Sequence, residues 1–278
     1  MKQQAQKRIL RAQCCSTSHS LIGWDSAREK RSNYKTQDPS SSYSISELQK
    51  TEFLLNPEAL SATIAPHELE MAPIIHYVAF PVTASHDLAQ FKEAFRLLGK
   101  ADGHISSFQG LQVTEEGAKN LYFISIWESI ALHKKFGEIS LVQQDNDIAK
   151  QFRPLKDAMS AAGDNLVRYH FHLVKGTAIP ALESKTTEFA LITPKKEASF
   201  ESVSKLGLKV RDVWDSNGHP AAFATGEENH DLILIIVGWP STTYHRDTVK
   251  NDPYVSIVNE FAQVGTFDIT HANLGKIN

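Results

Sequence analysis

Cysteine is almost missing from this chain of 278 residues, and the two that occur are neighbours. Cys14 and Cys15 have no partners elsewhere, which excludes a disulfide framework and a cysteine-ligated metal site. Long apolar runs are missing too. The longest candidate, residues 232–238, has the length of a strand, whereas a membrane helix needs roughly 18 such residues. We therefore expect a soluble, cytoplasmic protein that packing alone stabilises.

Acidic residues are scarce at the start of the chain. Residues 1–43 hold eight Lys or Arg and three acids, so this stretch carries +5 and the remainder −8 of the formal −3. A body this acidic argues against nucleic acid as the main partner. The stretch before Asp25 contains no acid at all, which resembles a mitochondrial presequence, and a solvated basic tail is the alternative.

Residues 1–43 also lack any sustained apolar period and are rich in Ser, Gln, Lys and Arg. Such a composition buries too little surface to offset chain entropy, so we predict a disordered tail. A capping box at Ser44 and Glu47 then predicts a short helical lead-in over residues 44–72.

The rest of the chain shows one order of elements twice. Apolar periodicity predicts strand, helix, strand, strand, helix and strand over residues 74–80, 88–98, 106–113, 121–127, 145–162 and 166–174, and again over 189–193, 200–210, 220–224, 232–239, 255–264 and 266–272. This is the βαββαβ arrangement. We therefore predict an α+β fold of two tandem ferredoxin-like repeats, residues 73–176 and 187–276, joined by a linker at 177–186.

One motif marks both repeats. Its Trp, Ser and His stand at Trp127, Ser129 and His133, and they recur with identical spacing at Trp239, Ser241 and His245. A Ser just after a strand is a natural helix N-cap, which is the simplest role for both serines. Each His then lies about one turn into the helix, near the Trp. An indole and an imidazole would edge a pocket in each repeat.

The third strand is apolar on both faces. Phe123, Ser125 and Trp127 share one face, and Tyr122 and Ile124 lie on the other. Helices can cover only one face of a four-stranded antiparallel sheet, so we expect two sheets to pack as a barrel with an apolar cavity inside. The sheets could pair within one chain or between two chains.

Three further histidines lie on predicted strands. His76 stands mid-strand in an apolar run, where a core histidine is the simplest interpretation. His170 and His172 share a strand face with Arg168, and this polar face must meet water, a partner sheet or a ligand. No glycine-rich dinucleotide motif and no His/Cys metal-binding spacing accompanies them.

The Trp-x-Ser-x-x-x-His stretch, together with Asp252, Pro253 and Tyr254, resembles the antibiotic biosynthesis monooxygenase branch of the dimeric α/β-barrel superfamily over about residues 72–275. The resemblance implies a cofactor-free pocket in which O2 oxidises polyketide-like or quinol-like phenols. The family's Trp and His positions carry over to Trp127 and His133, and to Trp239 and His245. The first repeat lacks the Asp-Pro-Tyr segment, and the second has Glu188 or Phe189 where the first has His76. We therefore expect two unequal cavities and favour the first.

The leading hypothesis is a cofactor-independent monooxygenase without a metal ion. Its catalytic base would be His133 or His76, because imidazole titrates near neutral pH. The substrate, a small aromatic molecule that reacts with O2, would contact Trp127, Phe123, Ser125, His170, His172, Trp239 and His245. The haem-degrading branch of the superfamily fits Trp127 and His133 less well.

Two alternatives stay open. His76 paired with His133 is similar to plant polyketide cyclases of the same superfamily, which close rings by an aldol-type reaction without O2. A binding or stress-response protein that keeps the barrel and has no turnover is the other.

Overall fold

The computed structural model describes residues 72–82, 91–141 and 147–277. The expected tail, residues 1–43, lies outside them, as does all but the last residue of the expected lead-in at 44–72. Among the described residues, no helix combines the length and the hydropathy that a membrane span requires.

The first half of the folded chain consists of strands with helices between them. Its elements are β1 (Ile74–Pro81), α2 (Lys92–Leu98), β2 (His104–Gln112), β3 (Asn120–Trp127), α3 (Ile130–Leu141), α4 (Asp147–Ala162) and β4 (Val167–Gly176). Along α2, from its N-cap to its last residue, Phe91, Ala94, Phe95 and Leu98 recur at helical spacing and are buried together. Helix α3 begins after Ser129, whose Oγ accepts a hydrogen bond from the Leu132 backbone N–H at 3.3 Å.

The second half also consists of strands with helices between them. Its elements are β5 (Thr186–Pro194), α6 (Phe200–Ser216), β6 (Ala221–Gly226), β7 (Ile233–Trp239), α7 (Thr242–Thr248), α8 (Tyr254–Val264) and β8 (Gly265–Ile277). Ser241 caps α7 by accepting from the Tyr244 backbone N–H at 3.1 Å. The expected linker at 177–186 contains a short helix, α5 (Ala178–Leu182), because its apolar residues Ala178, Ala181 and Leu182 are buried.

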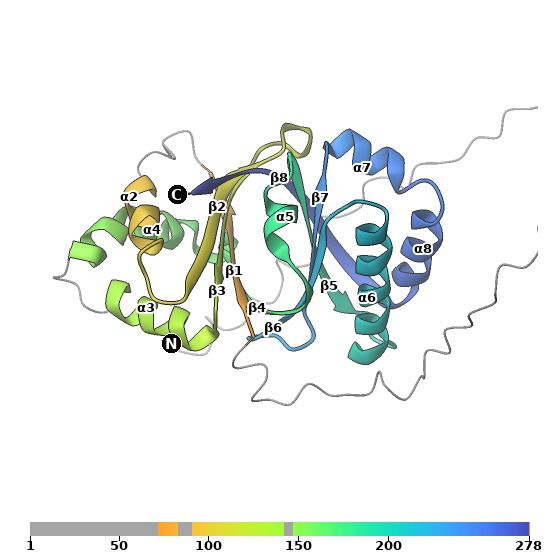
Figure 1. Ribbon diagram of the computed structural model, residues 1–278, viewed down its shortest axis with the longest axis horizontal. Helices are drawn as coiled ribbons and strands as arrows, with labels where there is room; N and C mark the ends of the chain where they lie inside the picture. Colours follow the sequence, from red (N-terminus) through yellow and green to blue (C-terminus); the bar gives the residue numbers. More distant parts are fainter. Residues whose placement is uncertain (1–71, 83–90, 142–146, 278) are drawn as a thin grey trace, which may run out of the picture. The chain divides into compact units, whose positions relative to one another are not determined.

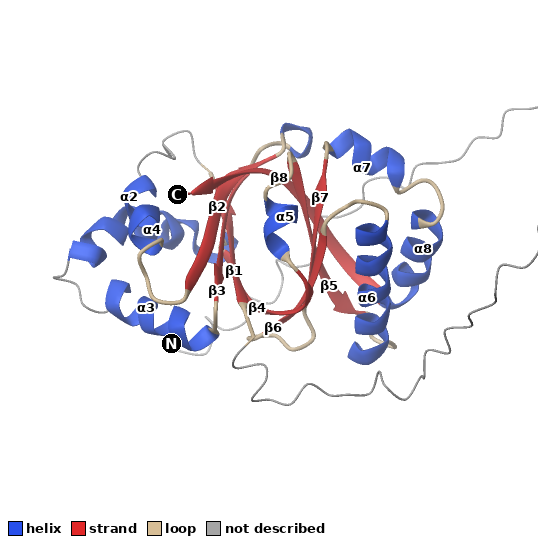
Figure 2. Cartoon of the chain, viewed as in Figure 1, coloured by secondary structure: helices blue, strands red, loops and turns tan. Residues whose placement is uncertain are grey.

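The eight strands close into one antiparallel barrel in the order β1-β3-β2-β8-β5-β7-β6-β4. The two halves meet at two seams, where β2 pairs with β8 and β4 pairs with β6. The barrel thus closes within a single chain. Helices α2, α3 and α4 lie on one side of it and α6, α7 and α8 on the other (Figure 1), so that the strands form the middle of the folded unit (Figure 2).

Apolar side chains from all eight strands fill the barrel interior. Among them, the rings of Tyr122 and Phe189 stack at a centroid distance of 5.4 Å and so join the two halves. Ala181 and Leu182 of α5 belong to the same core. The apolar ligand cavity that we expected inside the barrel is therefore occupied by the protein itself, because several inward positions carry large aromatic residues.

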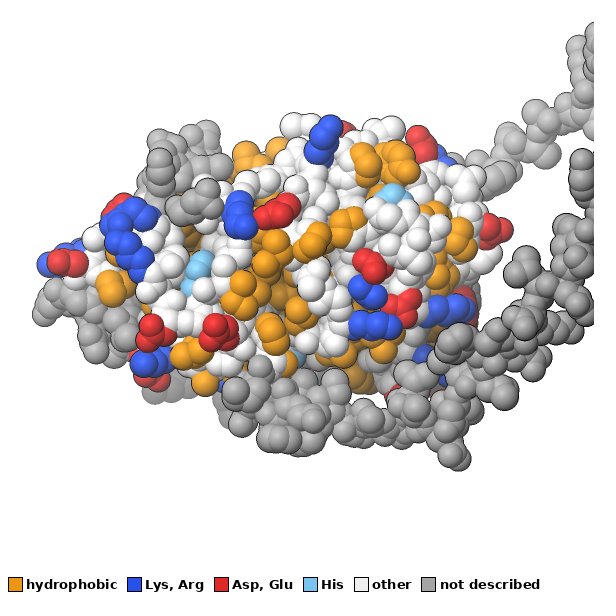
Figure 3. Space-filling model, in the orientation of Figure 1, with side chains coloured by type: hydrophobic (Ala, Val, Ile, Leu, Met, Phe, Trp, Pro, Cys, Tyr) orange, Lys and Arg blue, Asp and Glu red, His pale blue; other side chains and the backbone are white. Residues whose placement is uncertain are grey.

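Two further cores lie between the outer faces of the sheet and the helices. Along β1, Ile75 and Tyr77 point into the barrel, while Ile74 and Val78 pack against the helices of the first half. His76 has the parity of the outward set. Figure 3 shows that apolar side chains gather over the strands in the middle of one face, with charged side chains mainly toward the helices. The candidate site must be sought on the outer, helix-covered side of the sheet.

Candidate functional site

Three histidines meet outside the barrel wall in the first half. His76 on β1 lies directly opposite His170 on β4 in the strand register, and the two rings stack at a centroid distance of 4.8 Å. His133, one turn into α3, lies with its ring centroid 4.4 Å from that of His76. All three are partly buried. We call His76, His133 and His170 the first cluster.

The first cluster rests on three outward residues of β3. The Trp127 indole is fully buried, with its ring centroid 4.9 Å from that of His133, and its Nε1 donates a hydrogen bond to Ser125 Oγ at 2.9 Å. Phe123 meets the His76 ring edge to face at 6.4 Å. The residues predicted on one face of the strand therefore do lie together beside His76 and His133.

A carboxylate from the other half completes this cluster. Glu228, which follows β6, accepts from the His170 backbone N–H at 2.9 Å and also bonds to His170 Nδ1. The other ring nitrogen, His170 Nε2, lies 3.0 Å from His133 Nδ1. The result is a continuous chain from Glu228 through His170 to His133. His172 points to a different partner, since its Nε2 lies 2.7 Å from an oxygen of Glu227.

The second half holds a corresponding group. Glu188 on β5 lies opposite His271 on β8 in the register, and His271 Nε2 lies 2.8 Å from Nδ1 of His245 on α7. We call Glu188, His245 and His271 the second cluster. Here too a carboxylate comes from the other half: Glu116 lies 2.6 Å from His271 Nδ1 and accepts from its backbone N–H at 2.9 Å.

Known proteins resemble this chain in fold but not in sequence. No protein-family model and no curated protein sequence matches it. Two crystal structures resemble it. A suspected monooxygenase of Fusobacterium nucleatum has a TM-score of 0.55 and 10% identity, and the match covers 74% of this chain and 94% of that one. A suspected monooxygenase of Lactobacillus acidophilus has a TM-score of 0.51 and 12% identity, and the match covers 74% of this chain and 95% of that one. This chain shares their fold. At such low identity the likeness extends to the fold alone.

The structure brings together most of the predicted site residues, in two groups. His76, His133, His170, Phe123, Ser125 and Trp127 lie in or beside the first cluster, and Trp239 and His245 lie in or beside the second. Sequence reasoning missed Glu116, Glu228 and His271. The sequence does hold a signal for both glutamates, since Glu116 and Glu228 are separated by the same offset as Trp127 and Trp239, but it does not show which residues they contact.

Burial dominates the electrostatics of both clusters. It lowers the pKa of His133 to about 3, with His170 and Arg168 adding to the effect, and it lowers the pKa of His76 well below its usual range. Burial likewise lowers the pKa of His245 to about 4 and raises that of Glu188. His76, His133 and His245 are therefore neutral near pH 7 and have lone pairs to offer to a proton or a metal ion.

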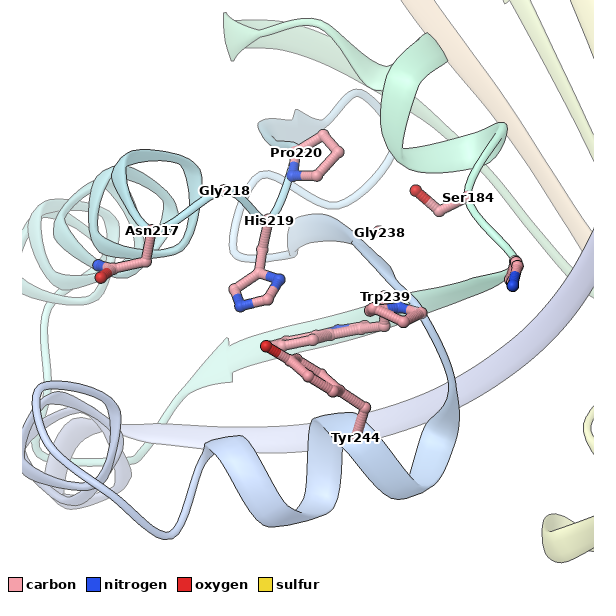
Figure 4. A pocket seen from close by; sticks show the side chains of 10 residues that line it. Ser184, Asn217, Gly218, His219, Pro220, Gly238, Trp239 and Tyr244 are labelled. Carbon is pink, nitrogen blue, oxygen red and sulfur yellow. The ribbon is translucent and has the colours of Figure 1, made fainter.

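A cleft of about 440 Å³ adjoins the second cluster. Figure 4 shows the rings of His219, Trp239 and Tyr244 facing one another in it. The Trp239 ring lies 4.3 Å from that of His219 and 4.6 Å from that of His245. Neither His245 nor His271 lines the cleft, so Trp239 is the contact between the cleft and the second cluster.

Proposed function

We propose that the protein is an oxygenase that uses O2 to oxidise a small aromatic molecule at the first cluster, without a cofactor. One observation carries this proposal: the chain from Glu228 through His170 to His133, which ends on a partly exposed imidazole beside the Trp127 indole. The fold shared with two suspected monooxygenases supports it as an analogy.

The chain orients the proposed base. A carboxylate at Glu228 accepts from His170 Nδ1–H, so a neutral His170 has its lone pair on Nε2. His133 Nδ1 must then donate to that lone pair, which leaves His133 Nε2 free to take a proton. The positive charge formed on His133 is stabilised through His170 by Glu228. We propose His133 as the catalytic base, with His170 and Glu228 as positioning residues.

The low pKa of His133 restricts the substrate. A base whose pKa is about 3 takes a proton only from a strong carbon or oxygen acid, or from one whose anion the site stabilises. Phenols and activated methylene groups on fused rings are much weaker acids than the His133 imidazolium, so the site would have to stabilise their anions. Because Trp127 is fully buried among His104, His133 and Phe136, we assign it to holding His133 in place and not to stacking on the substrate.

The proposed reaction balances without a further reactant. The methylene proton goes to His133 Nε2, and the carbanion passes one electron to O2. The two radicals combine into a C–O bond, and the peroxide anion formed takes the proton back from His133 Nε2. The hydroperoxide then loses water together with the second methylene hydrogen. One CH2 group and one O2 thus become one C=O group and one H2O. We assign His76, which is in ring contact with His133 and His170, to binding the substrate oxygen.

We further propose that the two halves are copies of one unit and that only the first copy is active. A single offset in the sequence relates Trp127 to Trp239, His133 to His245 and Glu116 to Glu228. The strand pairing follows the same offset: Ile74 lies opposite Trp127 in the first half, and Thr186 lies opposite Trp239 in the second. In the second copy Glu188 Oε2 lies 3.4 Å from His245 Nε2, the nitrogen that is free for a substrate in the first.

Oxygen uptake tests the function. Anthrone is a suitable probe because it is planar and tricyclic and has an acidic methylene group. We expect uptake above the uncatalysed rate and incorporation of labelled O2 into the product. His133→Gln should slow it about 10²- to 10⁴-fold, whereas His230→Gln, which alters an exposed histidine in the turn after β6, should not. Equal rates in His133→Gln and wild type would refute the proposal, as would no catalysed uptake.

The ring contact between His76 and His133 also favours a second candidate, an aldol-type cyclase. Two adjacent neutral imidazoles could take and return the protons of an enolisation. A linear poly-β-ketone thioester is the probe. Turnover under strict exclusion of O2 would establish the cyclase, and failure to turn over without O2, with anthrone oxidised in its presence, would exclude it.

A further inference from the structure

The proposed oxygenase reaction does not use the second cluster, which consists of Glu188, His245 and His271. Its three donor residues are almost inaccessible, with exposures of 6% for Glu188, 8% for His245 and 3% for His271. One oxygen or ring nitrogen of each lies within 4.8 Å of the other two donors. We propose that Glu188, His245 and His271 bind a divalent transition-metal ion.

The donor spacing suits a single ion. Metal–nitrogen bonds are about 2.0–2.1 Å long, so two nitrogens on one ion lie roughly 3 to 3.4 Å apart. His271 Nε2 and His245 Nδ1 are 2.8 Å apart, so an ion between them takes the place of the proton they share and requires a few tenths of an ångström of opening. Glu188 is held next to them because its carboxylate accepts a hydrogen bond from Trp239 Nε1 at 2.7 Å.

Outer partners fix two of the three donors, His271 and Glu188, as metal ligands require. Glu116 lies 2.6 Å from His271 Nδ1, so that the lone pair of a neutral His271 is on Nε2, which faces the cluster. A carboxylate behind a ligating histidine is the usual arrangement at protein metal sites, because it sets the tautomer and the ring orientation. The indole N–H of Trp239 does the same for the Glu188 carboxylate.

A bound cation would balance the charge of the buried Glu188 carboxylate. Removing a carboxylate from water costs several kcal/mol unless a charge partner compensates it, and the nearest potential partner of Glu188 is His245, at 3.4 Å. A divalent ion would neutralise Glu188 and Glu116 together. The first cluster differs in this respect, since its corresponding position is the neutral His76 and its three histidines are partly exposed.

The donor set also indicates which ions to test. Two imidazoles and one carboxylate suit Zn²⁺, Fe²⁺ and Co²⁺, whereas Ca²⁺ and Mg²⁺ prefer oxygen ligands alone. Their spacing along the chain, at residues 188, 245 and 271, matches no local metal motif. Barrel closure and the start of α7 bring them together. This inference is independent of the proposed oxygenase activity of the first cluster.

Zn²⁺ titration of the full chain tests the site. The chain is stripped with a chelator, and Cys14 and Cys15 are replaced by Ser so that the tail contributes no thiolate. We expect one Zn²⁺ per chain by calorimetry and, with Co²⁺, the visible absorption of a site with protein nitrogen ligands. Glu188→Gln and His271→Gln should abolish tight binding. Glu116→Gln, which leaves the ligands intact, should weaken it about 10- to 100-fold.

Zn²⁺ binding to a His76→Gln variant shows whether the ion binds at the first or the second cluster. The first cluster also brings three donors within 4.8 Å, so binding that is lost in His76→Gln and kept in Glu188→Gln would overturn the assignment. Absence of stoichiometric Zn²⁺ or Co²⁺ binding to the wild-type chain would overturn it as well, and this result does not depend on how any variant folds. Circular dichroism of each variant shows whether lost binding reflects lost structure.

Discussion

The proposed base, His133, depends on Glu228, although Glu228 itself does not touch the substrate in the proposed reaction. Glu228→Gln keeps the shape of the side chain and removes its charge, so the imidazolium formed at His133 is no longer stabilised through His170. We expect kcat for anthrone oxidation to fall on the order of 10²-fold with KM nearly unchanged. Steady-state kinetics in Glu228→Gln and in Glu227→Gln, whose carboxylate bonds to His172 instead, measure this difference. Similar losses in both variants would contradict it.

The partly buried His133 of the first cluster also predicts how stability depends on pH. In the unfolded chain a histidine titrates near 6.5, whereas burial lowers the pKa of His133 in the folded protein to about 3. Above pH 6.5 neither state takes up a proton there. Between 6.5 and about 3 only the unfolded chain does, so the free energy of unfolding falls as the pH falls, by at most about 1.4 kcal/mol per pH unit for this group.

Urea unfolding at several pH values between 7.5 and 4.5 is the measurement, with the slope compared between wild type and variants. His133→Gln should reduce the slope because it removes one group that titrates only in the unfolded chain. The exposed His230 serves as the control, and His230→Gln should leave the slope as it is. An unchanged slope in His133→Gln would mean that its imidazole titrates normally in the folded protein.

Among individual residues, the sequence pointed to the tryptophans and most histidines of the two clusters but not to the glutamates of the opposite half that contact them. Trp127 and His133 are close along the chain and were found from a repeated motif. Glu228 meets His170 across 58 residues and Glu116 meets His271 across 155, because each glutamate lies after a strand of the opposite half. Contacts of this kind arise from barrel closure, which no local spacing reveals.

Among the elements, β2 is special because it forms one seam between the halves. At Gly110 a Cβ would lie 1.9 Å from the carbonyl oxygen of Asn273 on β8, so Gly110→Ala must push the strands apart. We expect a loss of about 1–3 kcal/mol in the free energy of unfolding. Gly137→Ala is the matched control, since a Cβ there would meet nothing within 4 Å and alanine favours the helix by about 1 kcal/mol. A Gly110→Ala variant as stable as wild type would show that the seam can widen freely.

The strands could be predicted because apolar residues alternate or run along them, and the starts of α3 and α7 because a serine follows a strand. Helix α5 could not. The segment 177–186 has a proline and small residues, which are typical of a linker, and only its burial against the barrel interior makes it helical. The alternation along β3 correctly separated Phe123 from Tyr122, but it could not tell which side faces the helices.

For the molecule as a whole, the closed barrel predicts one cooperative unfolding transition. Phe108 of the first half and Phe189 of the second belong to the same interior core, and Phe189 stacks on Tyr122 across the halves. Phe108→Ala should therefore destabilise both halves together, by about 3–5 kcal/mol, instead of melting its own half first. Unfolding in urea is followed by far-UV circular dichroism and by tryptophan fluorescence. Within each protein, wild type, Phe108→Ala and Phe189→Ala, the two probes should give the same midpoint. Independent halves would instead separate the two midpoints in each variant, because the half with the intact core would unfold at higher urea.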